Sequence, residues 1–450
     1  MFNWILTHSP ILYFTQSLWR DEAFSILTAQ KPILSFIGQL NFEPPFYYVL
    51  LHFWIKVVGT SEIAVRSLSL LGFILACVVV IYWAEAQFEK HWLSWFVPIT
   101  FFLNPMLLYY AFEIRAYGWL IFFSTLSIYA YTQKKYWLLS LANIFAFYTH
   151  SYALFIPFIQ CVHYVATIKH KRQYLKKLLF LKDKYFLGLV VNGFSILPWF
   201  IPIIEEAKKM RPTWYYPVDL QLIKSVLGNI FVGYDGTPGG LWGYTATLSL
   251  IIAALCVYAL FLQKKRHEVS YLFTAIFLPL IIIIGVSFVK PMFVNRYVIF
   301  VTIAEVLLIG YALYTIQQKT LQKIAAVLLL IFILGVSFYL PSRKAKLDIR
   351  HTIQIAESQM KNTDMLYIKS PLLFFESFYY AKDKSRIFLY NPSQSPFPWY
   401  VGETAFSTSQ MRATLPAYPS RAIMIEDDGS ISISYTYYTT STQTELPQKK

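Results

Sequence analysis

Long apolar runs separated by short polar connectors dominate the chain up to about residue 340. Several runs reach or approach the roughly 20 residues that an α-helix needs to cross a hydrocarbon core of about 30 Å. The pattern predicts eleven membrane-spanning helices, near residues 2–19, 63–84, 92–111, 117–132, 136–150, 151–168, 185–202, 244–262, 270–289, 297–315 and 323–340. The first is short and contains His8, Ser9 and Pro10, which are unusual in a span.

The composition agrees with a membrane protein. Of the 450 residues, 56% are hydrophobic and only 14% are charged, whereas a soluble domain carries about a quarter charged residues. A soluble enzyme, a nucleic-acid binder and a disordered regulator are therefore excluded as descriptions of the whole chain. The three cysteines lie in apolar runs without C-x-x-C spacing, so we expect neither a disulfide framework nor a thiolate metal site.

The net charge of +15 is concentrated in alternate connectors. Five of them, at 85–91, 133–136, 169–184, 263–268 and 317–323, hold 15 Lys and Arg against four Asp and Glu. Because short basic loops remain in the cytoplasm, these five predict the cytoplasmic side, and no nucleic-acid partner is needed. Membrane lipids are expected partners of the basic loops. The other connectors and the C-terminus are then extracytoplasmic, and a bacterial plasma membrane is the expected location.

Three segments outside the predicted spans differ in sequence pattern from simple connecting loops. The first outer loop, 20–62, contains amphipathic stretches at 23–40 and 46–59, which predict helices lying in the membrane interface. The second, 202–243, is rich in Pro, Gly and Tyr, and the tail has strand-like runs at 365–368, 387–390 and 431–438. We predict an all-α polytopic membrane domain over 1–340 and a small extracytoplasmic α+β module over 341–450, frayed after about residue 439.

The preference of basic loops for the cytoplasm does not explain a further group of ionisable residues, which lie on the predicted outer side. Charged groups near a membrane are costly and frequently functional. They are Asp21, Glu22 and Glu43 in the first loop, Arg66 in the second span, Glu113, Arg115 and Tyr117 at one hairpin tip, His150 at the next, and Lys290, Arg296 and Tyr297 at a third. Carboxylates, a histidine and cations at one interface suit a substrate with an anionic group at headgroup depth.

Each of these residues also has a structural interpretation. Asp21 and Glu22 are favourable at a helix N-terminus whatever their function. Glu43 precedes a Pro-Pro turn, and Arg115 and Arg296 can extend to lipid phosphates, as arginines at helix ends commonly do. The aromatic residues are mostly interfacial belts, with Tyr215 and Tyr216 as candidates for stacking on a sugar.

The order of motifs resembles the GT-C-fold glycosyltransferases, in particular protein O-mannosyltransferases, lipid A aminoarabinose transferases and Rgt-type lipopolysaccharide glycosyltransferases. The resemblance is carried by LWRDEAFSILTAQ, NFEPPFYYVLLHFWIKVVGTSEIAVRSLSLLGFILA, NPMLLYYAFEIRAYGW and FYTHSYALF, and more loosely by KPMFVNRYVIF. It covers residues 15–160 most clearly. The combination of an acidic pair, Pro-Pro, G-x-S-E-x-x-x-R and E-x-R-x-Y in this order is specific, although each motif alone is weak.

The resemblance implies a membrane enzyme that moves a sugar from a polyprenyl-phosphate carrier to a cell-surface acceptor. It implies Asp21 as the general base with Glu22 as its acidic neighbour. Phosphate-binding residues would be Arg115, Tyr117, Lys290, Arg296 and Tyr297, with Arg66 and Glu113 supporting them. Many relatives have His where this chain has Glu43, so Glu43 and His150 are expected to bind a divalent metal ion or to orient the donor.

The expected chemistry agrees with these residue types. Cleavage of the donor places negative charge on phosphate oxygens, which arginine or a divalent ion stabilises. One carboxylate can take the acceptor proton, and a second, nucleophilic carboxylate is needed only for retention of configuration. We therefore predict single-displacement, inverting transfer. No nucleotide cofactor is expected, because the chain has neither a Walker-type loop nor G-x-G-x-x-G.

Two other functions remain open. A flippase for lipid-linked sugars would use the same basic groups, and Glu305, deep in a span, favours a proton-coupled pathway. However, inverted repeats and paired broken helices, which are common in such carriers, are not evident. A non-catalytic scaffold would leave the grouping of acids and cations on the outer side unexplained.

Overall fold

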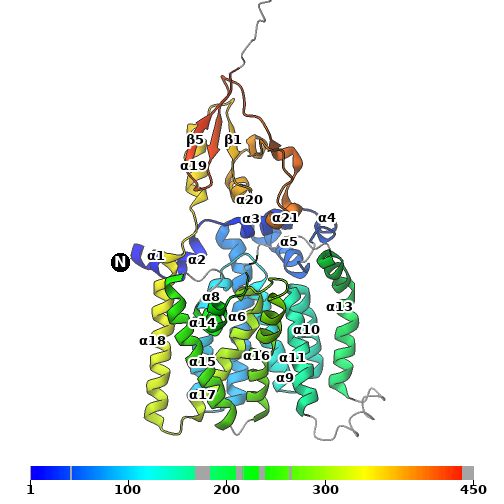
Figure 1. Cartoon of the computed structure of the whole chain (residues 1–450), viewed down its shortest axis with the longest axis vertical. Coiled ribbons are helices and arrows are strands. Elements are labelled where there is room, and N and C mark those ends of the chain that lie inside the picture. The colour runs from blue at the N-terminus through cyan, green and yellow to red at the C-terminus, as the bar shows by residue number, and fades with distance from the viewer. Residues whose placement is uncertain are drawn as a thin grey trace, which may run out of the picture. The chain divides into compact units, whose positions relative to one another are not determined.

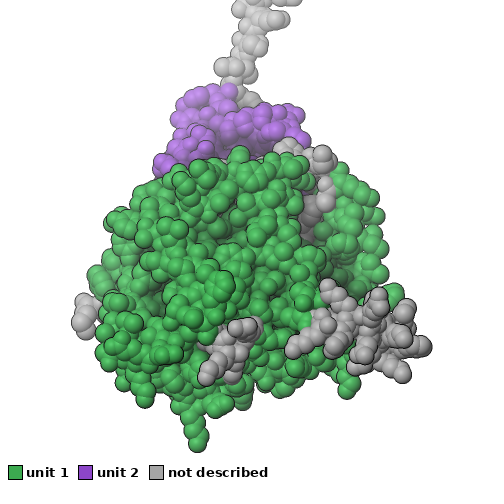
Figure 2. All heavy atoms as spheres, turned by 60° about the horizontal axis from the view of Figure 1, so that its bottom comes forward, with its two compact units in different colours: residues 1–15, 29–345 green, residues 16–28, 346–450 purple. Residues whose placement is uncertain are grey.

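The computed structural model describes residues 2–40, 43–167, 183–208, 215, 217–232, 239–262 and 266–437. The chain divides into two compact units, coloured separately in Figure 2. Unit 1 comprises Met1–Thr15 and Ala29–Ala345, and unit 2 comprises Gln16–Thr28 and Lys346–Lys450. The sequence analysis placed its boundary at 340/341 and did not indicate that residues 16–28 belong with the C-terminal part.

Unit 1 is a bundle of helices. They are α1 (Phe2–His8), α2 (Ile11–Thr15), α4 (Ile33–Ile37), α5 (Phe46–Val58), α6 (Glu62–Phe88), α7 (Leu93–Leu103), α8 (Pro105–Ala111), α9 (Tyr117–Thr132), α10 (Tyr136–Thr149), η1 (Ser151–Leu154), α11 (Phe155–Thr167), α13 (Lys184–Lys208), α14 (Leu220–Val232), η2 (Gly239–Leu241), α15 (Trp242–Leu262), α16 (Arg266–Ser287), η3 (Asn295–Val298), α17 (Ile299–Thr315) and α18 (Lys319–Arg343). The longer helices run side by side (Figure 1).

Six helices of the described chain are long and apolar enough to cross a membrane, or seven if the bent pair α7 and α8 is one span. These two helices meet at an angle of 57°, where the Asn104 side chain accepts the Leu107 N–H at 3.1 Å and Pro105 starts the second helix. The polytopic all-α class is therefore confirmed. The count of eleven stays a prediction, because α9, α10 and α11 are shorter than a full span.

The predicted first span is wrong as a continuous helix. The structure has α1 and α2 instead, with Ser9 and Pro10 between them. At about 1.5 Å per residue neither piece approaches the thickness of a hydrocarbon core. Trp4 of α1 stacks on Phe338 of α18, with ring centroids 6.2 Å apart, so the two short helices pack on the bundle rather than crossing a membrane on their own.

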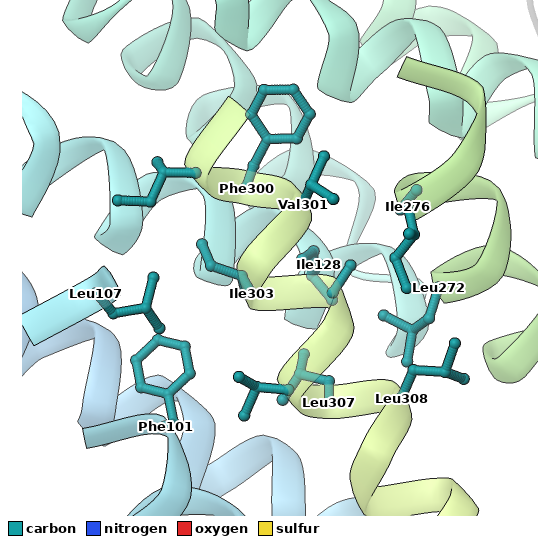
Figure 3. Packing of buried hydrophobic residues seen from close by; sticks show 14 of the residues in the cluster. Phe101, Leu107, Ile128, Leu272, Ile276, Phe300, Val301, Ile303, Leu307 and Leu308 are labelled. Carbon is teal, nitrogen blue, oxygen red and sulfur yellow. The ribbon is translucent and has the colours of Figure 1, made fainter. Parts of the chain in front are cut away.

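The core of unit 1 surrounds α17, whose span is 89% buried. Figure 3 shows this packing. Its labelled residues are Phe300, Val301, Ile303, Leu307 and Leu308 of α17 and Phe101, Leu107, Ile128, Leu272 and Ile276 of the helices around it. A helix that is apolar on nearly every side needs such an environment. Because η3 directly precedes α17, it lies at one end of this core.

Helix α14 is an element that the sequence analysis missed, because it lies in the stretch assigned to the loop 202–243. Its residues Ile230 and Phe231 are buried in the core, and the Ile230 carbonyl accepts the Thr302 hydroxyl of α17 at 3.1 Å. A Cβ on Gly228 would lie 2.0 Å from the Thr245 carbonyl oxygen. Glycine therefore permits the close approach of α14 to α15.

The first outer loop contains more and shorter helices than predicted. The stretch 23–40 forms the end of α3 (Arg20–Ala29) and then α4, while 46–59 corresponds to α5. The His52 Nδ1 of α5 lies 2.7 Å from the Ala29 carbonyl oxygen, and the Trp54 Nε1 donates to the Ala64 carbonyl oxygen at 2.9 Å. Helix α5 is thus joined to Ala29, which precedes α4, and to α6, which follows it.

Unit 2 is an α+β module, as predicted. Besides α3 it contains α19 (Ile349–Gln359), β1 (Met365–Ile368), α20 (Pro371–Tyr380), η4 (Lys384–Arg386), β2 (Ile387–Tyr390), α21 (Trp399–Gly402), η5 (Glu403–Ala405), η6 (Thr408–Gln410), β3 (Met411–Arg412), β4 (Ala422–Ile425) and β5 (Ile431–Ser434). The sheet order is β3-β2-β1-β4-β5. Strands β1 to β4 pair in parallel and β5 is antiparallel to β4. The predicted fraying after residue 439 lies outside the described residues.

Candidate functional site

Three hairpin tips of unit 1 bring an aromatic cluster together. We define the aromatic cluster as Tyr117 at the start of α9, His150 and Tyr152 between α10 and α11, Tyr297 in η3, and Tyr215. The His150 ring centroid lies 5.0 Å from that of Tyr297 and 5.9 Å from that of Tyr117. Tyr215 meets Tyr297 edge-on at 6.3 Å. Of the two tyrosines singled out for sugar stacking, Tyr215 thus joins the cluster, and Tyr216 lies outside the described residues.

Hydrogen bonds fix the backbone around His150. Its backbone is extended, so helix α10 ends there and the chain turns directly into η1. The imidazole Nδ1 accepts the Tyr152 N–H at 3.2 Å. The Tyr152 hydroxyl donates to the Met292 carbonyl oxygen at 2.7 Å, which joins this tip to the segment that leads into η3. The sequence analysis assigned no role to Tyr152.

Two predicted phosphate-binding arginines act on this cluster. Arg296 is almost completely buried, and its guanidinium carbon lies 5.4 Å from the centre of the Tyr297 ring. Arg115 and Arg296 are both close enough to exert an electrostatic effect on His150 and on Tyr117. Guanidinium groups beside phenol and imidazole donors form the kind of environment that binds a phosphate oxygen. Lys290 is exposed after α16, so it is not part of this buried group.

Glu43 pairs with one of these arginines. Its Oε1 lies 2.6 Å from the Nη2 of Arg115, and Tyr48 donates its hydroxyl hydrogen to the same carboxylate. The Arg115 Nη1 in turn donates to the Tyr48 hydroxyl at 3.3 Å. The loop carboxylate therefore holds the Arg115 side chain in a defined orientation, a role that the sequence analysis did not assign to it.

Glu43 and His150 are the two residues predicted to bind a metal ion or to orient the donor. No three His, Cys, Asp or Glu side chains of the described residues are arranged to hold an ion. Glu43 is engaged by Arg115, and two guanidinium groups act on His150. Positive charge beside the candidate ligand opposes the approach of a divalent cation. This favours the donor-orienting role of Glu43 and His150, while metal binding stays a prediction.

Arg66 and Glu113 are buried next to the hairpin that carries Arg115. Arg66 is fully buried, and its Nη1 donates to the Phe14 carbonyl oxygen at 3.0 Å. Glu113 is 3% exposed, and the Arg115 N–H donates to its carbonyl oxygen at 2.7 Å, which closes a tight turn. The supporting role expected of both residues stays a prediction.

A close helix crossing positions the same hairpin. The Ser69 hydroxyl of α6 donates to the Arg115 carbonyl oxygen at 3.1 Å, and a Cβ on Gly118 would lie 2.1 Å from the Ser69 carbonyl oxygen. We expect Gly118→Ala to separate α6 from α9 and to lower the free energy of unfolding by about 3 kcal/mol. Thermal unfolding in detergent measures this. Gly285→Ala is the control, since a Cβ there meets nothing within 4 Å, and equal stability of the two variants would contradict the expectation.

The predicted acidic pair lies in unit 2. The Asp21 carboxylate is 2.9 Å from the Nε of Arg20 and has 15% of its side chain exposed. Glu22 is completely buried, 3.0 Å from the Nζ of Lys346, and accepts the Trp19 N–H at 3.3 Å. This burial favours a structural role for Glu22 and leaves Asp21 as the candidate base. That Asp21 meets Arg115 and Arg296 in one pocket stays a prediction.

The sequence analysis did not single out the Glu376 carboxyl of α20, which also belongs to unit 2. Burial raises its pKa to about 8, although Lys346 and Arg20 act to lower it, while Glu22 and Asp21 raise it. The run PLLFFESFYY around Glu376 is apolar and aromatic apart from one serine, and it matches none of the motifs of the sequence analysis. Its burial in the folded protein is what identifies Glu376 as unusual.

The raised pKa predicts a pH dependence of stability. The folded form holds the proton more tightly than the unfolded chain, whose carboxyl has a pKa of 4.5. Stability from this group is therefore fully present below pH 4.5 and is lost as the pH rises through about 8. Hydrogen exchange of unit 2 between pH 5 and pH 9, with rates corrected for intrinsic exchange, measures it. In the Glu376→Gln variant, stability should change less between pH 5 and pH 9. An unchanged pH slope in that variant would show that the dependence does not come from Glu376.

A solved membrane protein has a similar structure. The crystal structure of ArnT from Cupriavidus metallidurans in the apo state is 13% identical, with a TM-score of 0.60 over 94% of this chain and 91% of that chain. The same protein bound to undecaprenyl phosphate gives a TM-score of 0.59 with the same identity and coverage. The chain has a GT-C fold. The fold implied by the sequence motifs is thereby confirmed. No protein-family model and no curated protein matches the chain.

Proposed function

We propose that this chain is a membrane glycosyltransferase that moves a sugar from a polyprenyl-phosphate carrier to an acceptor at the cell surface. The observation that carries the proposal is the nearly buried guanidinium of Arg296, which lies over the Tyr297 ring where that ring contacts His150 in the aromatic cluster. The shared fold with ArnT, which was solved with undecaprenyl phosphate, supports the same class of donor. The acceptor is a lipid, a glycan or a protein, and the reaction takes place on the outer face of the plasma membrane.

The chemistry follows from the charges. The bond between the anomeric carbon and the phosphate oxygen breaks, and its electron pair stays on the phosphate. Arg115 and Arg296 stabilise the negative charge that develops there. The acceptor hydroxyl oxygen bonds to the anomeric carbon from the opposite face, and its proton passes to the Asp21 carboxylate. A single displacement of this kind inverts the configuration, and it requires no covalent sugar–enzyme intermediate.

The test is transfer by the purified, reconstituted protein from a panel of radiolabelled polyprenyl-phosphate sugars to a cell-surface extract. We expect label from one donor to reach a lipid, glycan or protein fraction, with inverted anomeric configuration in the product. If no donor supports transfer but labelled donor crosses the vesicle membrane, the protein is a flippase instead. Neither transfer nor translocation would leave only the scaffold function.

A further inference from the structure

Residues 16–28 are attached to the C-terminal module by hydrogen bonds between backbone N–H groups and side-chain oxygens that span more than 300 positions of sequence. The Tyr380 hydroxyl accepts the Leu18 N–H at 2.7 Å. The Gln16 Oε1 accepts the Lys346 N–H at 3.1 Å, and the Ser17 hydroxyl accepts the Arg350 N–H at 3.2 Å. The segment that begins α3, and with it Asp21, is thus fixed by groups of α19, of α20 and of the chain just before α19.

A buried ion pair reinforces this attachment. The Lys346 Nζ lies 3.0 Å from the fully buried Glu22 carboxylate and 5.3 Å from the centre of the Trp19 ring. Because a buried carboxylate without its cation is strongly unfavourable, Lys346 determines whether Glu22 can remain inside. Glu22 follows Asp21 directly on α3. Burial of the Glu22 side chain therefore sets the orientation of the Asp21 side chain.

Close packing against a glycine holds the next turn of α3. The Phe24 ring lies beside Phe375 of α20, with centroids 5.7 Å apart. The Phe24 ring also packs against Gly402. A Cβ at Gly402 would come within 2.5 Å of two Phe24 ring carbons, and Gly402 has a φ of +121°. Only glycine accepts both this backbone conformation and this contact. The end of α21 is therefore built to receive the aromatic side chain of α3.

We propose that the C-terminal module holds Asp21 in position for proton transfer, with Lys346 and Gly402 as positioning residues; this inference rests on the proposed function. The module is then a part of the catalytic apparatus rather than a separate binding domain. A base displaced by about 1 Å can lose about 100-fold in rate. Loosening the attachment is accordingly expected to lower kcat, while the donor, bound by the arginines of unit 1, keeps its KM.

The experiment compares Lys346→Met, Lys346→Arg and Gly402→Ala in the full-length protein. Gly429→Ala is the matched control, because Gly429 also has a positive φ and a Cβ there also meets a side chain, but that of Leu347. Two quantities are measured for each variant: kcat and donor KM for transfer, and hydrogen exchange of residues 16–28. The exchange shows whether α3 has loosened while the rest of the module remains folded.

We expect Lys346→Met and Gly402→Ala to lower kcat by about 100-fold with donor KM within about twofold, and to speed exchange of residues 16–28. Lys346→Arg should restore most of the rate, and Gly429→Ala should behave like the wild type. Wild-type kcat in both Lys346→Met and Gly402→Ala, or faster exchange without loss of kcat, would overturn the inference. Loss of transfer in the wild type itself would remove the proposed function, and the positioning role with it.

Discussion

Replacement of Asp21 by Asn is expected to lower kcat for sugar transfer by about 100- to 10,000-fold, the usual contribution of a general base. Asparagine has nearly the same size as aspartate and can still accept from the Nε of Arg20, which lies 2.9 Å from the carboxylate. It cannot take a proton from the acceptor hydroxyl. Because the phosphate is bound by other residues, binding of a polyprenyl-phosphate sugar should stay within about twofold of the wild type.

The matched control for this variant is Asp348→Asn. Asp348 belongs to the same unit, and its side chain is 56% exposed, where it accepts the His351 N–H at the start of α19. The same change of charge there should leave kcat unaltered. Transfer by Asp21→Asn at the wild-type rate would show that the base is another group, whereas equal losses in both variants would point to the charge of unit 2 rather than to proton transfer.

Arg296→Gln should give the second large effect, a loss of about 100- to 1,000-fold in kcat/KM for the donor. Its guanidinium is nearly buried, lies over the Tyr297 ring and acts on His150 and Tyr117. Glutamine keeps hydrogen-bonding capacity but not charge, so the phosphate loses a charge-assisted bond in its bound state and more strongly in the transition state. Binding of the carrier phosphate without sugar, measured by displacement of labelled donor, should weaken as well.

Arg343→Gln serves as the control for charge. Arg343 also lies against a tyrosine, 5.1 Å from the centre of the Tyr339 ring, but it is exposed at the end of α18. We expect this variant to bind carrier phosphate and to transfer sugar normally. Undiminished binding of carrier phosphate by Arg296→Gln would remove Arg296 from the phosphate site, and the aromatic cluster would then need another ligand.

The pattern of apolar and polar residues correctly predicted those elements whose ends are marked by neighbouring residues in the sequence. Helix α9 begins and ends where expected, because charged connectors follow an apolar run of defined length. Strands β1 and β2 were likewise found at the predicted residues. The first span failed because Pro10 has no N–H to continue the helix. Helix α14 and strand β4 were missed because short apolar runs do not distinguish helix, strand and loop.

The sequence alone was enough to predict a multi-pass membrane protein with Arg115, His150 and Arg296 at the ends of helices. Span length and the placement of charge are local properties, which can be read along the chain. The pairing of Glu43 with Arg115 and the burial of Glu22 against Lys346 became visible only in the folded chain. These contacts join residues 72 and 324 positions apart. They depend on which surfaces pack together, and no local periodicity encodes that choice.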